Sequence, residues 1–234
     1  MAFNPVRKMA DNIAAIRIAL DFSGQQLSEA ELETLRKYAG FGGLKAVLFP
    51  PGNQEEWVNL NASQADLKLY PQVMELHSLL QEKLTVKDYK TAIDAVKSSS
   101  QTAYYTPGFL VEAIYSAMQS SNIFPKRLYE PSAGAGIFVD EAIKAFDKIE
   151  HETAVEKDIL TGKILKAICS AHPVPVDVQI KKLEETSATE KAQSDIVISN
   201  IPFGKIAVQD PAYNKSGISA KVHTYFFAKG LDKI

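Results

Sequence analysis

The chain has few features that would point to disulfides, metal or membrane. Among its 234 residues there is one cysteine, Cys169, so no disulfide can form within the chain, and the apolar pattern around it indicates a small buried side chain. No cysteine and histidine spacing matches a zinc site. No apolar run approaches the roughly 18 residues of a membrane span, and the N-terminus lacks the apolar core of a signal peptide. We therefore expect a cytoplasmic protein that binds no metal and no membrane.

The sequence also lacks an excess of positive charge. Lysine and arginine number 26 against 28 aspartate and glutamate residues, giving a formal net charge of −2. Proteins that bind nucleic acid on their own usually carry a basic excess, because the phosphate backbone attracts cations. This balance of charges argues against tight DNA binding by these residues alone. A basic patch in a concave surface is still compatible with the net charge.

Residues 1–100 are predicted to form a helical N-terminal region. Ser28 and Glu31 have the spacing of a capping box that begins a helix, and the glycine-rich segment Gly40–Gly43 predicts a tight turn. Trp57 is interpreted as a packing residue. Helical spacing of apolar residues is found in Asn12–Leu20, Val73–Leu84 and Lys87–Val96, the last closed by Ser98–Ser100.

Residues 101–234 show a different pattern, in which short apolar runs alternate with helical segments. This alternation predicts an α/β fold with a parallel sheet flanked by helices. In such sheets ligands bind beyond the carboxyl ends of the strands. The strands are expected at Arg127–Glu130, Glu152–Glu156, Val174–Ile180 and Asp195–Ser199, with helices at Phe138–Ile149 and Gly162–Ala171.

The first expected strand is followed by a glycine-containing loop. Gly134 and Gly136 allow the backbone to bend sharply and to approach a ligand, and the next helix begins directly after them. The third glycine of a dinucleotide-binding fingerprint is absent, because Val139 occupies its place. On its own, this segment is explained equally well as a structural turn.

Acidic residues follow the second strand. Glu156 and Asp158 stand where a carboxylate can accept hydrogen bonds from both hydroxyls of a ribose, although a solvated strand end is the simpler alternative. Thr161 is expected to cap the following helix. Taken together with the glycine loop, Glu156 favours a ligand that resembles a nucleotide.

The fourth strand leads into Asn200, Ile201, Pro202 and Phe203. Pro202 has no amide proton, and the proline favours an extended turn that directs backbone carbonyls outward. An amide oxygen, a carbonyl and an aromatic ring at one crevice suit a planar amine. Taken alone, a turn with one buried phenylalanine is the commoner explanation.

These motifs, in this order, resemble those of the amino-group DNA methyltransferases. Glu130–Gly136 is similar to their cofactor loop, and Asn200–Phe203 to their catalytic motif. Ala103–Pro107 resembles the segment that precedes the cofactor loop in the gamma arrangement of the family. Val222–Phe227 and Gly40–Leu44 resemble segments of the large methylases of phage and conjugative mobile elements.

The resemblance implies a Rossmann-like fold, S-adenosyl-L-methionine as cofactor and the exocyclic amine of adenine in DNA as methyl acceptor. Asn200 and the carbonyl of Ile201 would accept hydrogens from the amine beside Pro202, and Phe203 would stack on the flipped base. Thr106 would be a helix N-cap and Pro107 the first helical residue. The implied cofactor-binding residues are Tyr104, Thr106, Pro107, Glu130, Pro131, Gly134, Gly136, Glu156 and Glu184.

Two alternatives stay open. Methylation of a glutamine amide in a protein uses a related motif, and a catalytically silent module could use the same fold to bind DNA or a partner. The second position of the catalytic motif is Ile201, where many members of the family have proline. Because its backbone carbonyl accepts the hydrogen bond, isoleucine is compatible with activity. The incomplete glycine fingerprint disfavours a nicotinamide dehydrogenase.

The resembled enzymes have a larger sheet than the four strands expected here. We therefore expect residues 101–234 to be the N-terminal part of a methyltransferase domain, with DNA bound through the full-length protein. The fourth strand would then lie at an exposed edge, which favours self-association. These residues alone are expected to bind cofactor weakly and to methylate DNA poorly.

Overall fold

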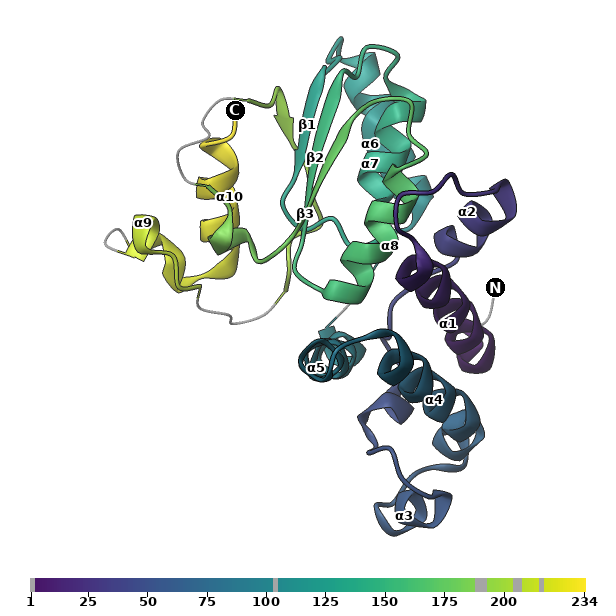
Figure 1. Ribbon diagram of the computed structural model, residues 1–234. Coiled ribbons are helices and arrows are strands. Elements are labelled where there is room, and N and C mark those ends of the chain that lie inside the picture. The colour runs from purple at the N-terminus through teal and green to yellow at the C-terminus, as the bar shows by residue number, and fades with distance from the viewer. Residues whose placement is uncertain (1–2, 103–104, 188–192, 204–207, 215–216) are drawn as a thin grey trace. The chain divides into compact units, whose positions relative to one another are not determined.

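The computed structural model describes residues 3–102, 105–187, 193–203, 208–214 and 217–234 (Figure 1). The chain divides into two compact units, Met1–Tyr105 and Thr106–Ile234. Each unit has its own set of secondary-structure elements, and each is described by itself below.

Helices are the regular secondary structure of the described part of the first unit, and turns and loops connect them. Its helix α2 begins with the expected capping box, in which Ser28 Oγ accepts the amide of Glu31 and the Glu31 carboxylate accepts the amide of Ser28. Trp57 is fully buried against Phe49 and Tyr70, as a packing residue should be. The elements are α1 (Pro5–Asp21), α2 (Glu29–Arg36), the short 3-10 helix η1 (Lys45–Leu48), α3 (Gln54–Asn59), α4 (Gln64–Lys83) and α5 (Val86–Thr102).

Three helices of this unit are longer than the sequence predicted. Helix α1 begins at Pro5, because Asn4 is its N-cap and accepts the Arg7 amide. Helix α4 begins at Gln64, because Ser63 and Asp66 form a second capping box, and it continues through Pro71. Helix α5 was expected to close at Ser98–Ser100, which is wrong. The hydroxyls of Ser99 and Ser100 donate to helix carbonyls three residues earlier, so these serines are accommodated within the helix.

The turn at Gly40 is fixed by a buried side chain on α1. Asn12 is completely buried; its Nδ2 donates to the Gly40 carbonyl at 2.8 Å and its Oδ1 accepts the Ala39 amide at 3.0 Å. Gly40 has φ of 61°, a left-handed conformation that favours glycine. One amide side chain thus satisfies two backbone groups of a turn that lies 27 and 28 residues away in sequence.

We predict that Asn12→Ala lowers the free energy of unfolding of this unit by about 2 kcal/mol, because it leaves a buried donor and a buried acceptor without partners. Fluorescence of Trp57, the single tryptophan of the chain, reports unfolding of this unit specifically. The neighbouring substitution Asp11→Asn alters only a part-exposed ion pair with Arg7 and should change the urea midpoint little. Equal midpoints for the two variants would contradict the role assigned to Asn12.

The second unit contains a four-stranded parallel sheet with the strand order β3-β2-β1-β4. Strand β1 pairs with β2 on one side and with β4 on the other. The unit has a Rossmann-like α/β fold, as the sequence predicted. Its strands are β1 (Arg127–Glu130), β2 (His151–Glu156), β3 (Val176–Ile180) and β4 (Ile196–Val197).

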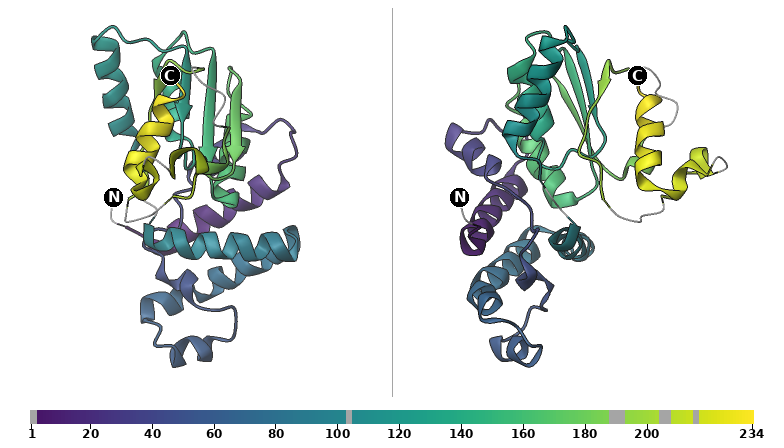
Figure 2. Two further views of the ribbon diagram at one scale, coloured as in Figure 1. Left: turned by 90° about the vertical axis from the view of Figure 1, so that its left-hand side faces the viewer. Right: turned by 180° about the vertical axis from the view of Figure 1, so that it is seen from behind.

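Helices cover both faces of this sheet (Figures 1 and 2). Helices α6, α7 and α8 lie on one face, where Leu128 and Ala154 of the strands pack against Tyr115 and Leu165. Helix α10 lies on the other face, where it packs against Tyr129. The remaining elements are α6 (Gly108–Ser120), α7 (Ile137–Ala145), α8 (Ile159–Cys169), η2 (Leu183–Glu185), α9 (Pro211–Asn214), η3 (Ile218–Ala220) and α10 (Val222–Leu231).

Strand β1 has the predicted bounds, but the other expected elements shift by one to four residues. Helix α8 begins at Ile159, because Asp158 is its N-cap and accepts the Thr161 amide at 2.7 Å, so the prediction that Thr161 caps this helix is wrong. Strand β4 is shorter than expected and stands at one edge of the described sheet. Self-association through that edge stays a prediction.

Candidate functional site

The loop after β1 is shaped by two glycines. Gly134 and Gly136 have φ of 56° and 88°, and Gly136 is the N-cap of α7. A Cβ at Gly136 would lie 2.5 Å from the Leu165 Cδ1 atom of α8. Both the backbone conformation and the close packing therefore require glycine, and the loop passes directly into the N-terminus of a helix.

Glu156, at the end of β2, is joined to this loop. Its Oε2 accepts the Gly134 amide at 2.8 Å and its Oε1 accepts the Asp158 amide at 2.7 Å. Burial raises the pKa of Glu156 to about 7, although these two amides oppose the shift. Each carboxylate oxygen has two acceptor positions, so the group can still accept hydrogen bonds from a ligand.

Glu130, the last residue of β1, is a second buried carboxyl group beneath the loop. It is 1% exposed, and its Oε2 has no hydrogen-bond partner among the described residues. Burial, followed by the charges of Glu156 and Glu152, raises its pKa well above the usual value. Glu130 therefore contributes to the electrostatics of the crevice from below its surface.

The segment after β4 lies beside the glycine loop. Ser199 Oγ donates to the Ser132 carbonyl at 3.4 Å, which joins the segments that follow β4 and β1. Asn200 Nδ2 donates to Thr106 Oγ1 at 3.1 Å. This bond joins the Asn200 side chain to the segment that precedes α6.

The residues that follow Asn200 in the motif differ in how far they are buried. Ile201 packs against the core beneath α10, whereas Phe203 is 60% exposed. Pro202 lines the adjacent pocket. The exposed ring of Phe203 is thus present at the rim, while the side chain of Ile201 serves the fold.

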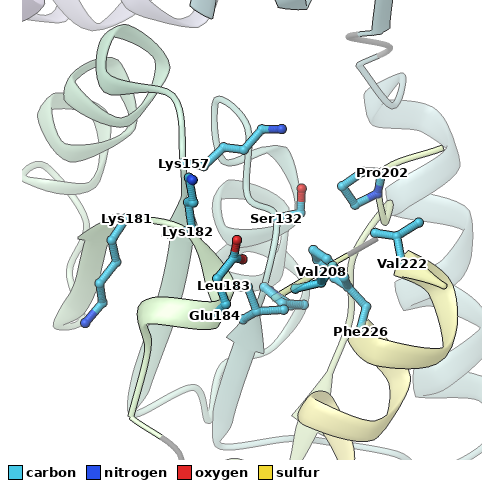
Figure 3. Close-up of a pocket in the computed structure, with 11 residues that line it drawn as sticks. Ser132, Lys157, Lys181, Lys182, Leu183, Glu184, Pro202, Val208, Val222 and Phe226 are labelled. Carbon is cyan, nitrogen blue, oxygen red and sulfur yellow. The ribbon is translucent and has the colours of Figure 1, made fainter. Parts of the chain in front are cut away.

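A pocket of about 300 Å³ opens at the carboxyl ends of the strands (Figure 3). One wall is formed by Leu183 and Glu184 after β3, and the opposite wall by Val222 and Phe226 of α10, with Val208 between them. Pro131, Ser132, Lys157, Lys181, Lys182 and Pro202 complete the lining.

The upstream segment differs in part from its prediction. Helix α6 begins at Gly108 with Pro107 as its N-cap, so the predictions that Thr106 is the cap and Pro107 the first helical residue are wrong. Proline has no side-chain acceptor for a capping hydrogen bond, and Thr106 turns its hydroxyl to Asn200 instead. Tyr104 lies outside the described residues.

The structure thus brings seven predicted residues to this edge of the sheet, while sequence reasoning missed the wall on α10. Val222 and Phe226 belong to a helix that was noted only for its resemblance, and Val208 follows a stretch without a recognisable pattern. A pocket wall made of ordinary apolar residues leaves no signal in a single sequence. The seven that line the pocket or are hydrogen-bonded beside it are Thr106, Pro131, Gly134, Glu156, Glu184, Asn200 and Pro202.

Other kinds of site are not found in the described part of the chain. No group of three or more histidine, cysteine, aspartate or glutamate residues there is arranged to hold a metal ion. No described helix has the length and hydropathy that a lipid bilayer requires.

Comparison with known proteins gives structural neighbours only. No family model matches the chain, and no curated protein matches its sequence. A protein from Pyrococcus horikoshii, described provisionally as an RNA methyltransferase, is 21% identical with a TM-score of 0.38; the match covers 51% of this chain and 58% of that one. A protein from Listeria monocytogenes, described provisionally as a class I S-adenosylmethionine-dependent methyltransferase, is 12% identical with a TM-score of 0.47, over 96% and 69% of the two chains. Neither likeness bears on the activity of this chain.

We predict that Gly136→Ala destabilises the second unit by about 3 kcal/mol, because the left-handed backbone and the contact with Leu165 both oppose a methyl group. Gly217→Ala is the matched control, since Gly217 also has a positive φ of 73° but no atom within 4 Å of the added Cβ. It should cost only about 1 kcal/mol. Labelling of Cys169, the single cysteine and buried in this unit, measures the opening; equal labelling rates would contradict the prediction.

Glu156 should make the stability of the second unit depend on pH. Its pKa is about 7 in the folded chain against 4.5 for an ordinary glutamate, so the folded state holds the proton more tightly. The free energy of unfolding should therefore fall as the pH rises from 4.5 to about 7, by about 3 kcal/mol at most.

Glu156→Gln tests this dependence, because glutamine cannot ionise. Urea unfolding at several pH values, read by Cys169 labelling at one fixed pH, should show a smaller decrease for the variant. The slope that remains would belong to other groups of this unit with raised pKa values, among them Glu130, Glu152 and Asp158, which burial raises. A slope identical to that of the unmodified chain would show that Glu156 does not titrate in this range.

Proposed function

We propose that the second unit binds S-adenosyl-L-methionine and contributes the catalytic motif for methyl transfer to the exocyclic amine of adenine in DNA. The observation that carries this proposal is the meeting of the glycine loop and the Asn200 turn. The Ser199–Ser132 hydrogen bond holds them side by side at the carboxyl ends of β4 and β1. A cofactor in the loop and an amine at Asn200 would therefore share one crevice.

The shape and polar groups of the crevice suit this cofactor. The adjoining pocket, which Pro131, Ser132 and Pro202 help to line, has a volume of about 300 Å³, at the lower end of the range for small-molecule sites. The left-handed conformation of Gly134 and Gly136 turns the loop into the N-terminus of α7, and Glu156 offers carboxylate oxygens for the ribose hydroxyls. When bound, S-adenosyl-L-methionine would supply the methyl group from its electrophilic sulfonium.

The pocket between β3 and α10 suits the adenine ring of the cofactor. Leu183, Val208 and Phe226 offer apolar surfaces for a flat ring, and Glu184 stands beside them with a carboxylate that can accept an amine hydrogen. This arrangement supports the role proposed for Glu184.

Asn200 would hold the acceptor amine. Its Oδ1 and the Ile201 carbonyl would each accept a hydrogen from the amine, which draws the nitrogen lone pair out of conjugation and makes nitrogen a better nucleophile. The Thr106 bond holds the Asn200 side chain in place at this edge of the sheet. As the new carbon–nitrogen bond forms and the carbon–sulfur bond breaks, one amine proton leaves to solvent.

Phe203 supports an aromatic acceptor rather than a glutamine amide. A phenylalanine that is 60% exposed at the rim offers a face on which a flipped base can stack. Stacking contributes about 1–3 kcal/mol, comparable to the cost of unstacking the base. The aromatic ring thus favours DNA, bound through the full-length protein, over the protein-amide alternative.

The proposal predicts a separation between binding and transfer. Isothermal titration should show heat of binding for S-adenosyl-L-methionine, weakened at least about tenfold in Glu156→Gln by the loss of a charged acceptor. Asn200→Ala should bind the cofactor nearly as the unmodified chain does, because the proposed role of Asn200 is to hold the acceptor amine and not the cofactor. In a single-turnover assay with excess protein, labelled methyl donor and single-stranded DNA, Asn200→Ala should form no methyladenine.

The same assay with RNA and with a glutamine-containing peptide identifies the acceptor class. Product with the peptide alone would overturn the assignment to a nucleic acid. Absence of any binding heat for the unmodified chain would favour the silent module, and an Asn200→Ala variant that retains full transfer would refute the catalytic role of the motif.

A further inference from the structure

Helix α10 packs against an apolar core, yet one of its buried residues is a lysine. Lys229 is 1% exposed, on a helix that otherwise presents Val222, Tyr225 and Phe226 to the sheet. Removing an ammonium group from water is costly unless other groups replace its hydration. The surroundings of Lys229 therefore need to supply specific partners.

Lys229 has two hydrogen-bond partners that come from different parts of the chain. Its Nζ donates to Asp210 Oδ2 at 2.9 Å and to the Thr186 carbonyl at 3.3 Å. It also lies 5.7 Å from the centroid of the Tyr225 ring. One ammonium group thus joins residues that lie 43 and 19 positions away from it in sequence.

Asp210 is held as firmly as Lys229. Besides the lysine, its Oδ2 accepts the Tyr225 hydroxyl at 2.7 Å and its Oδ1 accepts the Ala212 amide at 3.0 Å. Burial alone would raise the pKa of Asp210, but the bonds from Tyr225 and Lys229 reverse the shift and lower it. The pair is therefore an ion pair inside the protein.

The two partners of Lys229 each lie next to a wall of the pocket. Thr186 ends the η2 segment, three residues after Leu183, and Asp210 follows Val208 by two residues. Phe226, one helical turn before Lys229, lines the pocket from α10 itself. Through these bonds the ammonium group joins two segments to α10: the wall that contains Leu183, and the segment that contains Val208. The bonds lie behind the surface that faces a ligand.

We propose that Lys229 and Asp210 are positioning residues that set the spacing of the two pocket walls, and with it the affinity for the adenine ring of the cofactor. This inference rests on the proposed function for the identity of the ligand. Neither residue lines the pocket, so both act through Leu183, Val208 and Phe226. A flat ring is sensitive to such spacing, because dispersion contacts weaken steeply when a gap opens on one side.

The test uses the double variant Asp210→Asn/Lys229→Met in the full chain. Removing both charges avoids an unpaired buried ion, and replacing such a pair by neutral side chains of similar size often leaves stability unchanged. The bonds of residue 210 to Tyr225 and Ala212 can persist, whereas the tether to Thr186 is lost. Lys233→Met is the matched control, since Lys233 is a second buried lysine near the end of the chain and its ammonium group donates to the Ser187 carbonyl.

Titration with S-adenosyl-L-methionine and with its demethylated product should show about tenfold weaker binding for the double variant than for Lys233→Met. Hydrogen exchange of the Val208 amide, which donates to Ser219, should quicken in the double variant alone. Unfolding measured by Cys169 labelling should be similar in the double variant and the control, which separates positioning from general stability.

The outcomes distinguish this inference from the proposed function. If the unmodified chain binds the cofactor and the double variant binds it equally well, the positioning role is overturned while the proposed function stands. If the unmodified chain does not bind the cofactor, the proposed function fails, and the claim about cofactor affinity fails with it. The spacing role is then tested by hydrogen exchange alone. Equal exchange of the Val208 amide in the double variant and the unmodified chain would overturn that role as well. Equal weakening in Lys233→Met would also refute a specific role for Lys229.

Discussion

The pairing of β4 with β1 is the contact on which the candidate site depends. Strand β4 has only two residues, so two pairs of partners, Leu128 with Ile196 and Tyr129 with Val197, set its register. Asp195 secures one end by accepting the amides of Lys126 and Arg127 at 2.8 and 2.9 Å, bonds that lower its pKa. At the other end Ser199 bonds to Ser132.

This pairing places strand ends from distant parts of the sequence together. Since β1 has β2 on one side and β4 on the other, the loops that follow β1 and β4 leave the sheet as neighbours. If β4 paired elsewhere, Asn200 would not reach Thr106, and no crevice would join the glycine loop to the Asn200 turn. The chemistry proposed for the site is therefore a consequence of strand order.

The features of the site that depend on residues close together in the sequence could be predicted. Gly134 and Gly136 were recognisable because a turn into a helix needs positive φ, and the structure has 56° and 88° at these positions. Glu156 was recognisable because a strand end is a defined place in a parallel sheet. The capping box at Ser28 depends only on residues three apart, and it too was predictable.

The non-local part could not be predicted from one sequence. The bond between Asn200 and Thr106 joins residues 94 positions apart, and it overrides the local preference of a threonine before proline to cap a helix. Lys229 stands in an apolar helix where nothing marks it as buried, since its partners come from two separate loops. Such roles depend on tertiary packing, and local propensity carries no information about it.

The buried carboxyl groups beneath the crevice connect the fold to the charge of its proposed ligand. Glu130 and Glu156 end adjacent strands, and burial raises the pKa of both carboxyl groups, to about 7 for Glu156. A fold that only needed packing would gain stability from apolar side chains at these positions. A cationic ligand would favour the ionised carboxylates, lower their pKa values and release protons on binding. S-adenosyl-L-methionine carries a sulfonium and an ammonium group, so the same burial that costs stability in the free chain would make the crevice attractive to that cation.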